Sequence, residues 1–218
     1  MSKLRDKWAN PNDVATIMSC NTEGHPAWER ALQPRPSKPK KAAAGEASFT
    51  WAIEPEGGML EGTAYSDGSY LDGPIPELAR GGWAFAVLDD SGKIVASAYG
   101  VPPPWIKDIG GAEGWGVLQV GLRAMPGKVK YMIDCQPCVG MIHGGVVAAT
   151  TANRPLARVN GMVMSTLEDT STDKVVWMPA HKSKQAAGQF LCSNGVAITA
   201  FDIKGNAEAD RSAKLAVK

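Results

Sequence analysis

Apolar and polar residues alternate with a period of two in several stretches that begin near residue 60. Residues 62–67 and 81–90 are predicted to be the first two strands, because such alternation is typical of half-buried strands. Residues 89–92, Asp-Asp-Ser-Gly, supply hairpin-turn chemistry. Residues 93–101 return as a third strand, which the prolines at 102–104 end. The folded region is therefore expected to open with hairpin-linked strands.

The period then changes to that of a helix over residues 108–125. Asp108 can cap the start of this helix, and Pro126 and Gly127 can end it. Its apolar residues recur on one face at helical spacing: Trp115, Leu118, Leu122 and Met125.

Strand and helix patterns alternate through the rest of the chain. We expect a fourth strand at 128–134, helical regions at 136–149 and 155–169, a short fifth strand at 174–179, a long loop at 180–204 and a closing helix at 205–218 with Asn206 as its cap. Hairpin-linked strands followed by crossover helices predict an α/β fold, in which a mixed sheet carries helices on both faces.

Residues 1–59 show no such pattern, and we expect them to be a mostly disordered or loosely structured extension and linker before one domain at 60–218. The segment 32–48 contains three prolines and four basic residues, a composition typical of an extended tether. Its basic residues could contact phosphates or act as a nuclear localisation signal, but a solvated linker is the simpler interpretation.

Composition places the chain among ordinary globular proteins, with 44% hydrophobic and 21% charged residues. No apolar run approaches the roughly 18 residues that a membrane span needs, and the first residues lack the apolar core of a secretion signal. We therefore expect an intracellular protein without a membrane partner, in the nucleus or the cytoplasm. Four cysteines are too few for a disulfide framework.

Charge is balanced along the chain, so it makes no strong case for a polyanionic partner. The net charge is +1, and residues 61–218 hold 15 Lys and Arg against 15 Asp and Glu. If four of these acids bind cations, residues 61–218 keep 15 basic residues and 11 other acidic residues. A cation-loaded domain would then present a mildly positive surface to a duplex.

Four acidic residues are distinguished by where they fall in this pattern. Asp67 and Asp134 end the first and fourth strands, Glu113 lies in the first turn of a helix, and Asp210 lies in the last helix. Adjacent parallel strands would bring Asp67 and Asp134 side by side at one sheet edge. Packed carboxylates repel each other, and a hard divalent cation such as Mg²⁺ relieves that repulsion. A surface or capping role stays open for Glu113 and Asp210 taken singly.

The order of short motifs resembles that of the ribonuclease H family over residues 60–218. The motifs are YSDGS, GGWAFAVLDDSGKIV, Glu113 at the start of a helix, YMIDCQ, Pro179-Ala180-His181-Lys182 and GNAEADRSAKLA. The last motif after an upstream Pro-Ala-His is the most specific, and YSDGS is the next. The long loops suggest a retroelement origin.

The resemblance implies a five-stranded mixed sheet with its second strand antiparallel to the others. It also implies a metal-binding hydrolase: an endonuclease that cuts the RNA strand of an RNA/DNA hybrid with two Mg²⁺ or Mn²⁺ ions. Asp67 would bridge the two ions, Glu113, Asp134 and Asp210 would complete the set, and His181 would assist proton transfer or product departure. We expect a monomeric catalytic domain. The residues expected to bind substrate are Ser69, Gly111, Gln136, Lys182 and Asn206.

The sequence departs from the family where the RNA sugar is read. Family members often carry Asn-Gln before the helical glutamate, whereas Gly110 and Gly111 precede Ala112 and Glu113 here. Backbone amides could still contact the 2′-hydroxyls. Two alternatives therefore stay open: a catalytically inactive nucleic-acid-binding module, and a DNA-directed nuclease on the same fold.

The cysteine pair Cys135 and Cys138 allows three further interpretations. A CxxC at the start of a helix is the placement of a redox pair. A zinc site with His143 and Cys192 has suitable ligand types but poor spacing. Two small, mostly buried thiols near a helix start are the simplest interpretation.

Overall fold

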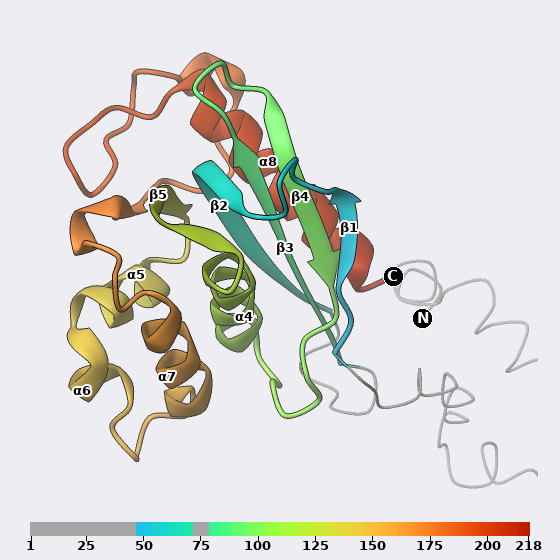
Figure 1. Cartoon of the computed structure of the whole chain (residues 1–218), viewed down its shortest axis with the longest axis vertical. Helices are drawn as coiled ribbons and strands as arrows, with labels where there is room; N and C mark the ends of the chain where they lie inside the picture. The colour runs from blue at the N-terminus through green and yellow to red at the C-terminus, as the bar shows by residue number, and fades with distance from the viewer. Residues whose placement is uncertain (1–46, 72–78) are drawn as a thin grey trace, which may run out of the picture. The chain divides into compact units, whose positions relative to one another are not determined.

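The computed structural model describes residues 47–71 and 79–218 (Figure 1). The expectation for the extension 1–59 therefore falls mostly outside the described residues. The described residues belong to one unit, Ala44–Lys218. No helix in this described part is both long enough and apolar enough to cross a membrane.

Six strands form one mixed sheet in the order β1-β4-β3-β2-β5-β6. Their bounds are β1 Thr50–Ile53, β2 Leu60–Leu71, β3 Arg80–Leu88, β4 Ile94–Gly100, β5 Ala124–Ile133 and β6 Val175–Trp177. β3 pairs antiparallel with both β2 and β4, whereas β5 pairs parallel with β2 and with β6. The second of the five expected strands is therefore antiparallel to the other four, as the resemblance implies.

The expected strand count of five is wrong by one, because β1 adds a sixth strand antiparallel to β4 at the sheet edge. The strand is short, and it lies within residues 1–59, which were expected to be an extension. Aromatic packing explains why it forms. Phe49 and Trp51 pack against the core residues Trp83 and Phe85, and the Arg123 guanidinium lies 3.8 Å from the centre of the Phe49 ring.

Helices cover both faces of the sheet, as expected (Figure 1). Ala64 and Phe85 point into one core cluster together with α4 residues, whereas their neighbours Tyr65 and Ala86 point into a second cluster with α8 residues. This alternation is the period of two read along β2 and β3. The helices are α4 Ile109–Gly121, α5 Gln136–His143, α6 Gly145–Ala149, α7 Ala157–Thr166 and α8 Ala200–Ala216, with short 3₁₀ turns η1 Thr172–Lys174 and η2 Lys184–Ala186.

The closing helix begins earlier than the sequence predicts. Thr199 caps α8 by accepting a hydrogen bond from the Asp202 amide, and the Asp202 carboxylate accepts from the Thr199 amide in return. This capping box adds one and a half turns before residue 205. Asn206 is therefore an interior residue of α8, and the expected capping role is wrong. Asp108 does cap α4, as expected, by accepting from the Gly111 amide.

Two features of the sheet position the predicted site. The parallel register pairs Ser66 of β2 with Ile133 of β5, so Asp67 and Asp134 are the next residues along neighbouring strands. α4 approaches β2 backbone to backbone at Gly68, where a Cβ atom would lie 2.6 Å from the Glu113 amide nitrogen. Only glycine allows this approach, which brings Glu113 beside Asp67.

Candidate active site

Three carboxylates from distant parts of the chain meet where β5 ends beside β2. Asp67 was expected to end its strand, but β2 continues to Leu71, so this acid lies inside the strand. One ligand atom each from Asp67, Glu113 and Asp134 lies within 4.8 Å of the other two. Asp67 comes from β2, Glu113 from the first two turns of α4, and Asp134 directly follows β5. The structure thus brings together three of the four acids that the sequence analysis singled out.

Burial and mutual repulsion disfavour the charged forms of these acids. Burial raises the pKa of Glu113 to about 10, and the nearby carboxylates of Asp67 and Asp134 add to the effect. Burial likewise raises the pKa of Asp67 to about 7, with the Asp134 charge as the next cause. Burial raises the pKa of Asp134 as well, although the Asn206 side chain, within hydrogen-bonding reach, opposes the rise. Burial and the acids' mutual repulsion therefore outweigh the contacts that favour ionisation of the cluster, so its carboxyl groups favour the neutral form.

The donor set fits a hard divalent cation. The Glu113 Oε2 atom is buried and has no hydrogen-bond partner among the described residues, although its carboxylate accepts from the Gly68 backbone. An orphaned buried carboxylate oxygen is costly unless a cation or a donor reaches it. Carboxylate oxygens at this spacing are the ligands that Mg²⁺ and Mn²⁺ prefer.

The fourth acid, Asp210, lies beside the trio without belonging to it. Its side chain is 23% exposed and accepts from Lys214, one turn further along α8, at 2.7 Å. It is close enough to raise the pKa of Asp67 through its charge and a side-chain hydrogen bond. In this structure Asp210 is therefore a neighbour of the cluster and a partner of Lys214.

His181 lies near the cluster on the loop after β6. It is exposed, and it is the one non-glycine residue with a left-handed φ, 50°, in the described part of the chain. Its charge lowers the pKa of Asp134. A left-handed non-glycine residue is uncommon and is found more often at functional sites.

The residues expected to bind substrate differ in their access to solvent. Gln136 is exposed at the first position of α5, and the Lys182 Nζ atom lies 4.3 Å from the centre of the Phe190 ring. Ser69 is buried in β2. The Gly111 amide donates its hydrogen bond to the Asp108 carboxylate at 2.7 Å, so it is not free to donate to a substrate. Asn206 is only 4% exposed, so its place suits the positioning of Asp134.

Sequence reasoning missed a second contact to Asp134. The Trp177 Nε1 atom donates to the Asp134 main-chain carbonyl at 3.0 Å. β6 pairs Trp177 with Ile133, and this register directs the indole toward the residue that follows. Sequence pattern placed Trp177 in a strand but carried no signal for this bond, which depends on which strands are neighbours.

The structure favours the simplest interpretation of the cysteine pair at the start of α5. Cys135 and Cys138 are free thiols. Burial raises the pKa of Cys135 to about 11 and that of Cys138 well above its usual value. Thiols that resist ionisation are poor nucleophiles and poor zinc ligands. Within the described ranges, no cysteine belongs to a group with metal-ligand spacing.

Comparison with known proteins yields similarity of structure only. No protein-family model matches the chain, and no curated protein matches it in sequence. Protease-reverse transcriptase of prototype foamy virus is 17% identical with a TM-score of 0.53, over 77% of this chain and 22% of that one. RNase H1 of the halophilic archaeon Halobacterium salinarum is 16% identical with a TM-score of 0.45, over 71% of this chain and 95% of that one. The RNase H domain of prototype foamy virus is 17% identical with a TM-score of 0.46, over 73% and 96% of the respective chains.

Strand order, strand direction and the likeness to the foamy virus protein agree on one architecture. The chain has the ribonuclease H-like fold expected from its motifs, extended by β1 at one edge of the sheet. At 17% identity the likeness shows the fold alone. Any activity must therefore be argued from the side chains.

Proposed function

We propose that the chain is a divalent-metal-dependent endonuclease that hydrolyses the RNA strand of RNA/DNA hybrids. The observation that carries this proposal is the meeting of Asp67, Glu113 and Asp134 within 4.8 Å on a ribonuclease H-like sheet. The buried, partnerless Oε2 of Glu113 supports it, because such an atom calls for a cation.

Asp67, Glu113 and Asp134 would hold the ions, with Asp210 completing the set from α8. When bound, two Mg²⁺ or Mn²⁺ ions supply an activated water and stabilise charge on the phosphate. The chain's own contribution is to hold three carboxylates together in a buried, low-dielectric site. Gly68 allows α4 to come close enough to β2 for Glu113 to lie beside Asp67. Asn206 contacts the side chain of Asp134, and Trp177 donates to its main-chain carbonyl.

His181 would move a proton in this reaction. It is exposed on the loop after β6, and it lies close enough to Asp134 to lower the pKa of that carboxyl group. An imidazole there can deliver a proton to the departing 3′-oxygen and exchange it with solvent. Gln136 and Lys182, which reach solvent nearby, would contact substrate.

A second candidate function, a nuclease with weak or reversed preference for RNA, is favoured by one observation. The Gly111 amide, the group expected to replace the missing Asn-Gln side chains, donates to Asp108. Neither Gly110 nor Gly111 offers a side chain for a 2′-hydroxyl. Preference for RNA over DNA would then depend on the shape of the duplex.

A cleavage assay on labelled substrates tests both proposals. We expect the full chain to cut the RNA strand of a hybrid in Mg²⁺ or Mn²⁺ and to be inactive in EDTA. Asp67→Asn should lower the rate at least about a thousandfold, because it removes the central carboxylate. The exposed Asp90→Asn should cut like the parent.

The same assay on duplex DNA and duplex RNA separates the candidates. Cleavage of duplex DNA in preference to the hybrid would favour the second candidate. Absence of cleavage on every substrate and in both metals would leave only the inactive binding module.

A further inference from the structure

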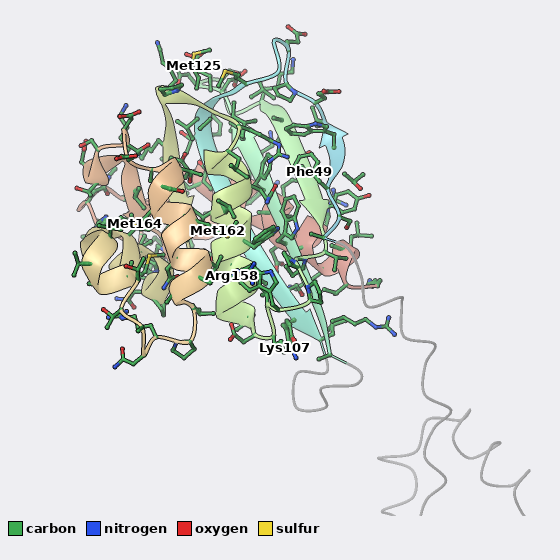
Figure 2. All side chains as sticks on the ribbon, turned by 60° about the horizontal axis from the view of Figure 1, so that its bottom comes forward. Phe49, Lys107, Met125, Arg158, Met162 and Met164 are labelled. Carbon is green, nitrogen blue, oxygen red and sulfur yellow. The ribbon has the colours of Figure 1, made fainter. Side chains whose placement is uncertain are left out.

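A cavity of about 210 Å³ lies on the face of the sheet that α8 covers, between the start of this helix and the loop at 192–199. Side chains from β2, β3 and β5 form its floor, and α8 contributes Phe201 and Asp202 to its wall. Helices α4 and α7 pack on the opposite face, where Figure 2 labels Arg158 and Met162 of α7. The lining of the cavity contains no member of the carboxylate trio, so it is a separate site.

The floor and the rim of this cavity are largely apolar. Leu88, Met132 and Tyr65 line it from the second core cluster. Val196 and Phe201 line it from the rim, and they are 56% and 47% exposed. Large apolar side chains that line a cavity and still reach solvent favour an apolar ligand group. Pockets for drug-sized molecules measure about 300–1,000 Å³, so this one suits a smaller molecule with a single aromatic ring.

Hydrogen-bond donors gather at the β5 end of the cavity. Thr63 of β2 pairs with Lys130 of β5, so the two side chains are neighbours in the lining. Lys130 is half-buried, and it forms no ion pair within residues 47–71 and 79–218. Asn194 uses its carbonyl oxygen to accept from the Val196 amide, which leaves its NH₂ group for another acceptor. An ammonium group, a hydroxyl and an amide NH₂ at one end of a cavity suit a carboxylate.

The acids of the lining do not oppose this placement. Asp202 is engaged, because its carboxylate accepts from the Tyr65 hydroxyl at 2.8 Å. Asp89 and Asp90 lie in the turn after β3, which is two strands, and therefore roughly 10 Å, from Lys130 in β5. An anionic group beside Lys130 is thus separated from these two acids by the apolar floor.

We propose that this cavity binds a small aromatic carboxylate. The carboxylate group of the ligand accepts from Lys130, Thr63 and Asn194, and its ring packs between Met132 and Phe201. The inference goes beyond the proposed function and does not depend on it, because the cavity and the carboxylate trio share no residue.

Ligand-observed NMR titrations of the full chain with phenylacetate test this proposal. EDTA is present throughout, so that no cation at the carboxylate trio can hold the probe. We expect saturable binding with a Kd of about 1 mM, which is typical of a ligand of this size. 2-Phenylethylamine has the same ring with an ammonium group in place of the carboxylate, and it should bind at least about tenfold more weakly.

Two substitutions change opposite parts of the cavity. Lys130→Ala should weaken phenylacetate binding about tenfold, because it removes a charged hydrogen bond. Val196→Asp should weaken it by a similar factor, since it places a negative charge at the apolar rim. Lys128→Ala is the matched control and should bind like the parent. Lys128 lies two residues earlier in β5, is exposed and pairs with Glu61 outside the cavity.

Thermal melts show whether each variant folds. Val196→Asp changes an exposed side chain, so it keeps the test informative if Lys130→Ala does not fold. Absence of saturable phenylacetate binding, equally tight binding of 2-phenylethylamine, or parent-like binding in both cavity variants would overturn the site. An equal loss in Lys128→Ala would overturn it as well, because the charge of β5 and not the cavity would then explain binding. Each of these results leaves the proposed nuclease function standing.

Discussion

Single carboxylates decide how this protein responds to pH. Asp67 and Glu113 hold a proton more tightly in the folded chain than in the unfolded one, because burial and each other's charge disfavour ionisation. Between the ordinary pKa of a carboxyl group and the raised one, the folded state therefore binds more protons. The free energy of unfolding must fall as pH rises through this window.

For the metal-free protein we expect stability to decline from about pH 4 to about pH 7 as Asp67 ionises, and further toward pH 10 as Glu113 does. Each group contributes a slope of at most about 1.4 kcal/mol per pH unit. Urea melts in EDTA between pH 5 and pH 8 measure the slope.

Asp67→Asn should flatten this profile and stabilise the metal-free protein at pH 7 by about 2 kcal/mol. The same variant should lose the stabilisation that Mg²⁺ gives the parent. Asp90→Asn serves as the exposed control. A parent profile that is flat in EDTA, or an Asp67→Asn variant less stable than the parent at pH 7, would contradict the electrostatic account.

Residue by residue, sequence predicted the acids better than the groups that support them. Asp67 and Asp134 could be found because each acid follows apolar strand residues, and the fold brings strand ends together. Asn206 could not be assigned correctly, because its burial depends on α8 beginning at Ala200. Trp177 acquires its bond to Asp134 only through strand neighbours that no local pattern reveals.

At the scale of elements, the contact between α4 and β2 sets the geometry of the site. An added Cβ at Gly68 would lie 2.6 Å from the Glu113 amide nitrogen, whereas one at Gly116 meets its nearest neighbour, the Ala84 carbonyl oxygen, at 3.4 Å. Both glycines lie in the same interface, but only Gly68 has no room for a methyl group.

Gly68→Ala should therefore push α4 from the sheet, cost about 1–3 kcal/mol of stability and lower the cleavage rate far more than stability alone explains. Gly116→Ala should be neutral or stabilising by about 0.5–1 kcal/mol, since alanine favours the helix. Unfolding free energies and cleavage rates measured in parallel check the pair. If the two substitutions had equal effects, the close approach at Gly68 would not be what sets the geometry of the site.

The start of α4 was predicted well, but the helix ends at Gly121 and not at residue 125, because β5 already begins at Ala124 and includes Pro126 and Gly127. Leu122 and Met125, expected on the apolar face of the helix, are exposed.

The strands β2, β3 and β4 lie where the sequence predicts them, but both faces of β3 are buried from Gly82 to Leu88, because helices cover both sides of the sheet. The region 136–149 divides into α5 and α6, because it holds paired glycines at 144 and 145 and the second has φ of 79°. β1 escaped detection because its four residues are stabilised by aromatic packing against distant strands.

At the scale of the whole chain, the position of β1 moves the expected start of the domain toward the N-terminus. We propose that the folded domain begins before Phe49 and not at residue 60. A chain of residues 44–218 should fold with the stability of the full protein. A chain of residues 60–218 should lose about 2–4 kcal/mol, since Trp51 and Phe49 no longer cover Phe85. Denaturant melts of the two chains distinguish these boundaries, and equal stability would restore the boundary at 60.

The central claim is that Asp67, Glu113 and Asp134 meet in order to hold divalent cations. Crystals soaked in Mn²⁺ test it most directly, because the anomalous signal of manganese locates each ion without reference to activity. The account predicts anomalous peaks within ligand distance, about 2.2 Å, of these carboxylate oxygens, with Asp210 turned from Lys214 toward the ions. A map without a peak between the three carboxylates, in crystals whose remaining structure agrees with this fold, would contradict it.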